Sequence, residues 1–367
     1  AYDPTYIFSK TWRTPTTIYG LKDPNANPRE YEGAIVEQNK ASLNQSIYRG
    51  YGLTYQAGFN YDKRFRDHKI GGLVLFEARS ISSLNWGLSR KNYELDIDEI
   101  NMGSSSGSDI ATSGSSNMTK QVGLVYRVNY NFRERYLLEA SGRYDGHYYF
   151  APGKRFGFFP AVSAGWRISE ENFLKDVSWL DDLKFRVSYG ESGNLAGAPF
   201  QYLSSFNGRN SVYMINGNIL NGLIESSEAN VDIAWERSKK RNIGVDGTIF
   251  NHLINFSFDY FFEKRSNMLI APDVTTPLEY GIGLSQVNAG IMDNRGIEFS
   301  GGFEKTIGKN LQIELTGNFS WAKNKMVNLF ESESTFNNPN RRMTGRPWGT
   351  QFGYKAIGYF QPEDFDH

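Results

Sequence analysis

The sequence contains no cysteine, and only four of its 367 residues are histidine. Without cysteine the chain cannot form a disulfide, a zinc–thiolate site or an iron–sulfur cluster. The histidines are far apart and form no HExxH pair; they are His68, His147, His252 and His367. No GxGxxG or Walker sequence is present either. The sequence therefore predicts no metal site and no cofactor.

The chain also lacks an excess of either charge, since 40 Lys and Arg stand against 40 Asp and Glu. A nucleic-acid-binding protein needs a positive field to neutralise phosphates, so no nucleic-acid partner is expected. No apolar run approaches the roughly 20 residues of a membrane-spanning helix, and the mean hydropathy is −0.52. These values exclude a helical membrane protein. They do not exclude a membrane β-barrel, whose strands alternate apolar and polar residues.

What the sequence has is strict alternation of apolar and polar residues over long stretches. From Val122 to Phe132, every second residue is large and apolar, which is typical of a strand with two different faces. The same alternation recurs at 51–62, 183–189, 254–262 and 311–321. Further candidates bring the total to about eleven strands: 68–80, 136–145, 156–169, 238–250, 295–305 and 352–360.

The connections between these strands alternate in length, which favours an antiparallel transmembrane β-barrel over a soluble sandwich. Tight turns are expected at 133–135, 251–252 and 308–310, on the periplasmic side. Long polar loops are expected on the extracellular side, at 81–120, 146–155, 191–236, 265–293 and 323–351. The segment 169–182 falls where a short turn is due, and Ser169 followed by Glu170 and Glu171 predicts a short capped helix there.

The alternation also predicts which face of each strand meets lipid. Shifting the register of the strand at 183–189 by one residue would move Lys184 and Arg186 to the lipid face. Each would then cost roughly 2–4 kcal/mol near the midplane of the membrane. Charged residues of both signs are therefore expected to face the lumen: Arg127, Glu139, Arg143, Lys184, Arg186, Asp246, Asp259, Glu298, Glu304 and Glu314. Such a lumen is either filled with water or packed against another polar body.

Aromatic residues make up 15% of the chain. On the lipid face they fall at strand ends, where the two membrane interfaces favour amphipathic rings. Phe132, Tyr136 and Trp166 are expected on the turn side. Tyr144, Tyr189, Tyr260 and Trp321 are expected on the loop side.

About eleven strands is an odd number, whereas single-chain bacterial barrels use an even number. An open sheet would leave unpaired backbone groups in hydrocarbon at several kcal/mol each. Residues 1–367 are therefore expected to form part of a larger transmembrane barrel, closed by strands outside this sequence.

Residues 121–171 carry QVGLVYRVNYNFRERYLLEASGRYDG and then RFGFFPAVSAGWRISEE. Further segments follow in a fixed order: WLDDLKFRVSYGESGN at 179–194, the Trp-Glu and Asn-Ile-Gly-Val-Asp of 235–246, NAGIMDNRGIEFS at 288–300 and GRPWGTQFGYKAIGYF at 345–360. In these motifs and their order the chain resembles the SusC/RagA-type TonB-linked outer-membrane proteins. The resemblance covers most of 47–360.

That resemblance implies the C-terminal part of a 22-stranded barrel in the outer membrane of a Gram-negative cell. It implies nutrient import with a SusD-like surface lipoprotein as partner, and energy from the TonB–ExbB–ExbD system acting through a plug domain. The cargo would be a small oligosaccharide or a peptide. No plug domain and no TonB-contacting segment is recognised within 1–367, and 146–150 reads Gly-His-Tyr-Tyr-Phe where relatives continue with a Ser-Ser-Arg-Phe-like run.

Aromatic residues of the outer loops are the candidate ligand contacts, because flat rings stack on sugars and also form adaptable peptide pockets. They are Trp86, Tyr93, Tyr148, Tyr149, Phe150, Tyr202, Tyr213 and Tyr280. Packing between loops or against the lipoprotein explains each of them equally well.

No enzymatic activity is expected. Gly103-Ser104-Ser105-Ser106-Gly107 formally matches G-x-S-x-G, but it lies in a Ser/Gly-rich stretch rather than between a strand and a helix. The acidic run from Glu94 to Glu99 lacks the spacing of a calcium loop. A passive porin or structural barrel, a soluble all-β glycan-binding module and, last, an outer-membrane hydrolase are the alternatives.

Overall fold

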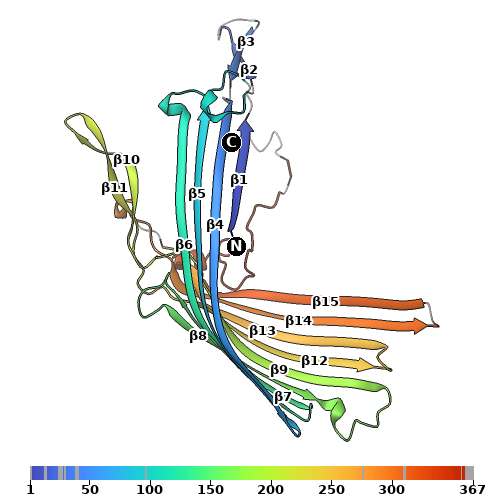
Figure 1. Cartoon of the computed structure of the whole chain (residues 1–367). Helices are drawn as coiled ribbons and strands as arrows, with labels where there is room; N and C mark the ends of the chain where they lie inside the picture. Colours follow the sequence, from blue (N-terminus) through green and yellow to red (C-terminus); the bar gives the residue numbers. More distant parts are fainter. Residues whose placement is uncertain are drawn as a thin grey trace. The chain divides into compact units, whose positions relative to one another are not determined.

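The computed structural model describes residues 2–11, 15–23, 28, 30–37, 41–95, 97–274, 277–308, 311–356 and 358–359 (Figure 1). Its strands are β1 (Tyr2–Thr11), β2 (Pro15–Leu21), β3 (Tyr31–Glu37), β4 (Ser42–Phe65), β5 (His68–Lys91), β6 (Ile110–Phe132), β7 (Tyr136–His147), β8 (Phe156–Arg167), β9 (Leu180–Asn194), β10 (Ser205–Ile215), β11 (Asn218–Ser227), β12 (Glu236–Ile249), β13 (Ile254–Ile270), β14 (Val287–Ile307) and β15 (Leu311–Asn328). The helices are single turns: η1 (Ile100–Met102), η2 (Gly107–Asp109), η3 (Ile168–Glu170), η4 (Leu278–Tyr280) and α1 (Glu333–Phe336).

Eleven strands form one sheet in the order β1-β4-β5-β6-β7-β8-β9-β12-β13-β14-β15. Two hairpins, β2–β3 and β10–β11, form separate two-stranded sheets, and Ser227 at the end of β11 also makes an isolated parallel bridge with Gly283. The chain divides into two compact units, residues 1–55 with 78–121 and residues 56–77 with 122–367. In the first unit, β1 pairs antiparallel with the start of β4, from Tyr2 opposite Tyr51 to Thr11 opposite Ser42.

The second unit contains most of the wall. Figure 1 shows β9, β12, β13, β14 and β15 running side by side, each antiparallel to its neighbour. A predicted tight turn joins β12 to β13, where Asn251 and His252 have φ near +60°. At the turn predicted between β14 and β15, Gly308 has a φ of 65°, and residues 309–310 lie outside the described residues. The all-β, antiparallel fold is therefore confirmed.

The predicted number of eleven strands matches the main sheet, but one member of the set is wrong. The four hairpin strands β2, β3, β10 and β11 were not predicted. The segment 352–360 alternates in sequence, yet its described residues form no strand, and Tyr354 and Tyr359 are fully exposed. The eleventh strand is β1, which the sequence analysis did not predict. Alternation alone does not make a strand, because a strand also needs a neighbour that takes up its backbone hydrogen bonds.

Several predicted loops are shorter than expected because the flanking strands extend into them. β5 runs to Lys91 and β6 begins at Ile110, so both ends of the predicted loop at 81–120 are paired, including part of its Ser/Gly-rich stretch. Likewise β10 and β11 form a hairpin inside 191–236. Polar residues pair as well as apolar ones once a strand leaves the membrane, since the backbone supplies the bonds.

The helix predicted within 169–182 is also wrong. Only the single 3₁₀ turn η3 forms, and its N-cap residue Arg167 makes no side-chain capping bond. Ser169 does not cap a helix, because its hydroxyl donates to Asp182 at 2.8 Å instead.

The registers give the sheet two distinct faces. On the apolar face, Phe185, Val245, Phe258, Phe299 and Phe319 lie in direct succession across β9, β12, β13, β14 and β15. Four of these rings are 36–56% exposed, as expected for side chains that meet lipid rather than a protein core. On the other face, the next positions hold charged and hydroxyl side chains. This is the alternation of a membrane-spanning wall.

The buried core of the second unit is small and lies on the polar side, near the loop end. It consists of Phe150, Phe159, Ile233 and Trp235, each at most 9% exposed. The Trp235 indole donates to the backbone oxygen of Arg155 at 3.1 Å, which satisfies its one polar group. This core ties the segment 147–155 and the start of β12 to β8.

Candidate functional site

The polar face of β7–β15 carries the charged residues that the sequence analysis assigned to the lumen. Glu139 on β7 lies opposite Ser163 on β8, and Ser163 lies opposite Ser188 on β9. Arg186 is two positions from Ser188 on β9 and therefore points to the same face. The same face continues through Asp246, Asp259 and Glu298, and then through the Glu304–Glu314 pair. By the alternation of side chains along their strands, Arg143, Lys184 and Arg127 lie on this face as well.

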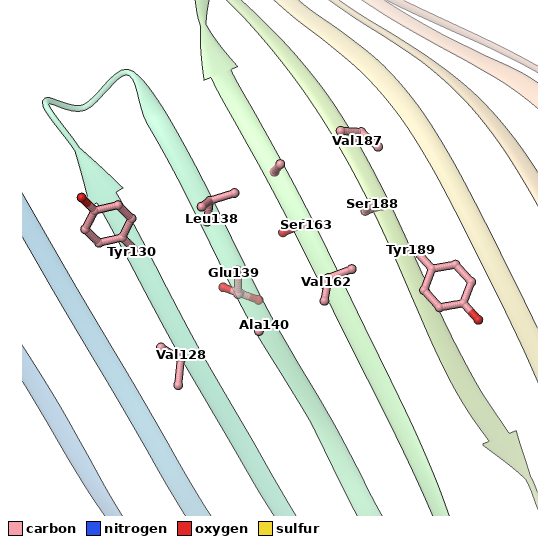
Figure 2. Close-up of a pocket in the computed structure, with 11 residues that line it drawn as sticks. Val128, Tyr130, Leu138, Glu139, Ala140, Val162, Ser163, Val187, Ser188 and Tyr189 are labelled. Carbon is pink, nitrogen blue, oxygen red and sulfur yellow. The ribbon is translucent and has the colours of Figure 1, made fainter.

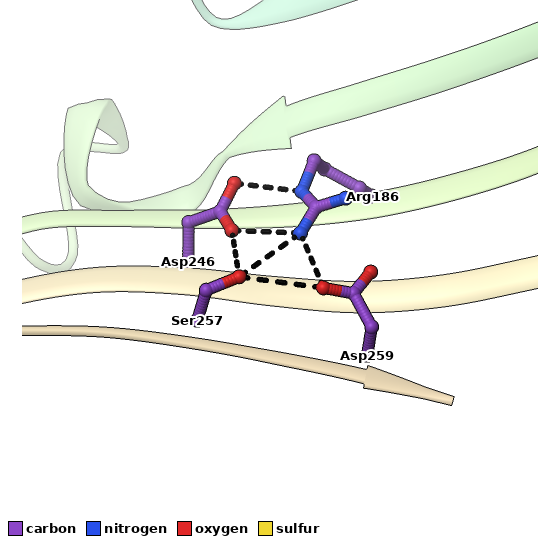
Figure 3. A network of polar contacts seen from close by, with 4 residues as sticks. All are labelled: Arg186, Asp246, Ser257 and Asp259. Carbon is purple, nitrogen blue, oxygen red and sulfur yellow. Dashed lines mark hydrogen bonds and ion pairs between the residues drawn. The ribbon is translucent and has the colours of Figure 1, made fainter. Parts of the chain in front are cut away.

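Arg186 is the centre of the main ion-pair network on this face (Figure 3). Its Nε donates to Asp246 Oδ2 at 2.6 Å and its Nη2 to Asp246 Oδ1 at 2.7 Å, a bidentate pair. The same Nη2 reaches Asp259 Oδ2 at 3.1 Å. Ser257 lies between the two acids and donates to Asp246 at 2.8 Å. One guanidinium on β9 therefore holds together carboxylates from β12 and β13.

A glycine makes room for this network. Gly244 lies between Arg186 and Asp259 in the register. A Cβ atom at this position would lie 2.5 Å from Asp259 Oδ1 and 2.8 Å from Arg186 Nη2. Both distances are shorter than contact, so the absence of a side chain is what lets the guanidinium lie flat on the strand.

A second polar cluster repeats the arrangement on β7. Arg143 donates to Asp145 at 2.8 and 2.9 Å and lies 3.8 Å from Glu77, which accepts from Gln56 at 2.6 Å. Gly123 again leaves the space, since a Cβ there would lie 2.4 Å from Asp145. Charged side chains on this face thus neutralise one another in the plane of the sheet.

Between the clusters lies a cavity of about 460 Å³ on the polar face. Cations, amides and hydroxyls line it, among them Lys69, Asn129, Ser163, Lys184 and Asn242. These groups can hydrogen-bond a polar body in many orientations, while Tyr130, Leu137, Leu138 and Val187 add apolar surface to the lining.

A second cavity, of about 470 Å³, lies mainly on the opposite face (Figure 2). Figure 2 shows Val128, Leu138, Val162 and Val187 side by side on neighbouring strands. These are apolar residues of the lipid-facing set, so this groove matches acyl chains better than a water-soluble ligand.

At the turn end, Glu171 ties two lipid-face aromatics to the backbone turn. Tyr136 donates to Glu171 at 2.6 Å, the Trp166 indole donates at 3.1 Å, and Arg135 pairs with the same carboxylate at 3.3 Å. The hydrogen bonds from Tyr136 and Trp166 lower the pKa of Glu171. The two rings thus lie at the edge of the apolar band with their polar atoms pointing to the water side, as expected for an interfacial belt.

The loop end carries a cluster of aromatic rings. Tyr148 and Tyr149 contact Phe200 with ring centroids 5.1 and 5.8 Å apart, and Phe200 also lies 6.4 Å from Tyr202. His147 packs against both tyrosines at 5.3 and 4.2 Å. We call Tyr148, Tyr149, Phe200 and Tyr202 the outer aromatic cluster. The half-buried rings leave part of each face open to solvent.

His147 supports this cluster as a neutral ring. It is 2% exposed, its Nδ1 accepts from the Tyr149 amide at 3.3 Å, and its Nε2 has no hydrogen-bond partner among the described residues. Burial lowers the pKa of His147. A protonated imidazole here would leave a charge without a partner, so the neutral form is favoured.

The other candidate contact residues are distributed differently. Phe150 and Tyr93 are only 2% and 5% exposed and offer little surface to a ligand; the Tyr93 hydroxyl donates to the backbone of Ile100 at 3.1 Å. Trp86 lies within strand β5 and is 47% exposed, and Tyr280 lies in η4 and is 43% exposed. Tyr213 is in β10, and its side chain lies outside the described part of the structure.

Two participants in these clusters, Ser257 and Phe200, were not predicted. Ser257 could have been found from the sequence, because it shares the alternation of Asp259 on the same strand. Phe200, by contrast, follows Pro199 in an irregular segment, and no periodicity points to it. Among the described residues, no group of His, Asp and Glu has the geometry of a metal site.

The family model for the TonB-dependent receptor-like β-barrel matches residues 2–366. The chain belongs to this family. Its members are transporters and receptors of the outer membrane rather than an enzyme class. Within the described residues, no helix is both long and apolar enough to cross a membrane.

Individual proteins with similar sequences agree with this assignment. TonB-dependent receptor P39 of Formosa agariphila is 28% identical over 344 residues, which cover 92% of this chain and 32% of that protein. TonB-dependent receptor SusC of Bacteroides thetaiotaomicron is 32% identical over 206 residues, 55% of this chain and 20% of SusC. The chain therefore spans about a third or less of the length of these relatives.

Solved structures give the same fold. The RagAB peptide importer in its closed-closed state superposes with a TM-score of 0.73 at 22% identity, over 84% of this chain and 34% of that one. The family model and the similarity to SusC confirm the resemblance drawn from the sequence motifs, and this superposition confirms the fold.

Proposed function

We propose that this chain forms part of the barrel wall of a TonB-dependent importer that takes up oligosaccharides or peptides across the outer membrane. The observation that carries the proposal is the two-faced wall. Its outward face is apolar, and on its inward face Arg186 and Arg143 pair with neighbouring carboxylates. Such a wall presents no strong net charge to a passing solute or to a polar plug.

The energy for transport would come from TonB acting on a plug domain, and a SusD-like lipoprotein would close the outer mouth. SusC and the RagAB importer, which this chain resembles in sequence and fold, are the basis for these partners. The polar cavity lined by Lys69, Asn129 and Lys184 is suited to hold a plug by many weak hydrogen bonds, which a pulling force can break one by one.

The outer aromatic cluster is the proposed contact for cargo on this chain. Tyr148, Tyr149 and Tyr202 present both ring faces and hydroxyls, a combination that serves sugar stacking as well as peptide side chains. Trp86 and Tyr280 remain further candidates. The RagAB complex, which this chain resembles in fold, is a peptide importer, so peptides are the first cargo to test.

Uptake in cells that make the full-length protein tests the proposal. Labelled oligopeptides and labelled oligosaccharides are supplied separately to cells with and without a functional TonB protein. We expect uptake of one class, and its loss without TonB. Equal uptake in both strains would instead identify a passive pore. Purification in detergent should in addition yield a surface lipoprotein in stoichiometric amount.

A further inference from the structure

The lipid-facing side of the sheet changes character at its loop end. On β15, outward positions are apolar from Leu311 to Trp321, a length of 11 residues. A tilted strand needs about 9–11 residues to cross the hydrocarbon. The next two outward positions are Lys323 and Lys325, so both cations lie directly beyond the apolar band on the extracellular side.

Neighbouring strands repeat this change at the same height. Lys323 lies opposite Arg295, which lies opposite Phe262 and then Arg241. One step further out, Lys325 lies opposite Asp293, followed by Lys264, Lys239 and Glu191. We call Lys239, Arg241, Lys264, Arg295, Lys323 and Lys325 the basic band.

The band has an excess of positive charge in a chain that is neutral as a whole. Its six cations share their two rows with only two carboxylates, Glu191 and Asp293. Glu191 already pairs with Arg237 at 3.1 Å and with Lys239 at 3.6 Å. Among the described residues, no carboxylate lies within ion-pair distance of Arg295, Lys323 or Lys325.

The outer end of the band encloses a cavity of about 430 Å³. Arg295, Lys323 and Lys325 line it together with Asp293 and the ring of Phe262. The segment that follows β15 supplies the remaining wall through Gly345 and Pro347. It is fixed to β15 by hydrogen bonds from the Met326 amide to the Arg346 oxygen and from the Gly345 amide to the Met326 oxygen, at 2.8 and 2.7 Å.

From this arrangement we infer that the basic band binds the phosphate groups of a phosphorylated glycolipid in the outer leaflet. On this face the apolar rings, which suit acyl chains, are followed by the cations of the band, which suit phosphates. A phosphorylated lipid presents its acyl chains and its phosphates in the same order. Asp293 also lines this cavity, where its buried Oδ1 makes no hydrogen bond with the described residues. Neither feature depends on the cargo of the transporter.

The inference is tested on the full-length protein in nanodiscs, with bis-phosphorylated lipid A as the probe and its dephosphorylated form as the comparison. Lipid that stays bound after extraction is counted by native mass spectrometry. We expect the wild-type protein to retain the phosphorylated form at least tenfold more than the dephosphorylated form. Equal retention of the two forms overturns the inference, and so does displacement by millimolar inorganic phosphate alone, which would indicate a site for the free anion.

A charge-matched pair of variants locates the site. R295Q/K323Q/K325Q removes three cations of the band. K240Q/R341Q/R342Q removes three cations elsewhere, since Lys240 lies on the polar face and the two arginines lie in the segment after α1. We expect the first variant to lose phosphorylated lipid at least tenfold and the second to retain it. Equal retention by both overturns the assignment.

Should the first variant fail to assemble, the salt dependence of the wild-type protein gives the answer. Retention of phosphorylated lipid is expected to fall steeply between 50 and 500 mM salt, while retention of the dephosphorylated form stays constant. Salt-independent binding of both forms would contradict a contact made by cations.

Discussion

Arg186 and Asp246 form a bidentate pair across β9 and β12, and the same guanidinium reaches Asp259 on β13. Replacing Arg186 by Gln leaves two carboxylates side by side with no cation between them. We expect R186Q to lower stability by about 1–2 kcal/mol, a value reduced from that of a buried pair because these side chains are partly exposed. The thermal midpoint of the full-length protein in detergent measures the loss. R186Q/D246N should regain part of it, and K240Q on the same face serves as the control.

Gly244 gives a steric test of the same network. A methyl group there meets Asp259 Oδ1 at 2.5 Å and Arg186 Nη2 at 2.8 Å, whereas a methyl at Gly317 on β15 meets nothing within 4 Å. G244A is therefore expected to destabilise the protein and G244V to do so more strongly, because the guanidinium must move off its partners. G317A should be neutral. Equal midpoints for G244V and G317A would contradict the packing described for Arg186.

The two faces can be distinguished with adjacent residues on one strand. Val187 points to the apolar face and Ser188 to the polar face. V187R is expected to cost about 2–4 kcal/mol, because an arginine then lies in hydrocarbon. S188R adds a cation to a face already lined by charges and should cost much less. The fraction of full-length protein that resists heat unfolding in gels reports both variants, and equal losses would argue against a lipid-facing Val187.

The outer aromatic cluster predicts a transport defect without an assembly defect. Y148A/Y149A/Y202A removes three ring faces and is expected to reduce uptake of the cognate labelled cargo roughly tenfold. F206A is the matched control, because Phe206 is a 61% exposed ring in β10 outside this cluster. Normal uptake by the triple variant would show that cargo binds elsewhere.

Acid should release the segment that follows β15. The Asp273 carboxylate accepts from the Ser332 amide and hydroxyl at 3.1 and 3.0 Å, and Glu331 accepts from the amides of Met343 and Thr344 at 2.6 and 3.1 Å. Hydrogen bonds lower the pKa of Asp273, chiefly those from Thr335 and Ser332. Burial opposes the shift at Glu331, but the bonds from Thr344 and Met343 outweigh it and lower that pKa as well.

Because both pKa values are lower in the folded state, the two carboxylates stabilise the segment fully above their unfolded values of about 4. This contribution is lost as the pH falls through the lower folded values. Amide exchange at Ser332, Met343 and Thr344 should therefore accelerate below about pH 4, relative to the intrinsic rate. D273N/E331Q should show fast exchange at neutral pH already. If exchange in the wild-type protein does not depend on pH, the carboxylates do not hold the segment.

Much of this fold can be predicted from the sequence because a membrane imposes a simple rule on each strand. The alternation around Phe185, Phe258 and Phe319 indicates which side chains meet lipid, and the paired faces follow from it. The alternation is not required outside the hydrocarbon, where β5 and β6 continue through polar residues. Pairing there depends on the neighbouring strand, and β1 was missed for this reason.

The clusters on the polar face were only half predictable. Parity places Arg186, Asp246 and Asp259 on one face, but the choice of partners depends on the stagger between strands. The sequence does not encode that stagger locally. The role of Gly244 becomes visible only once the register is known. The outer aromatic cluster depends in the same way on Phe200, whose position is set by the irregular chain around it.

The length of β14 has a further consequence. Its 21 residues extend roughly 70 Å, or about 50 Å along the membrane normal at a tilt near 45°, whereas the apolar band is about 25 Å tall. About half of the strand thus stands outside the hydrocarbon as hydrogen-bonded sheet. The loop end of β14 is therefore held by ladder hydrogen bonds to β13 and β15 on both sides. That part of the strand keeps its conformation without the support of the lipid.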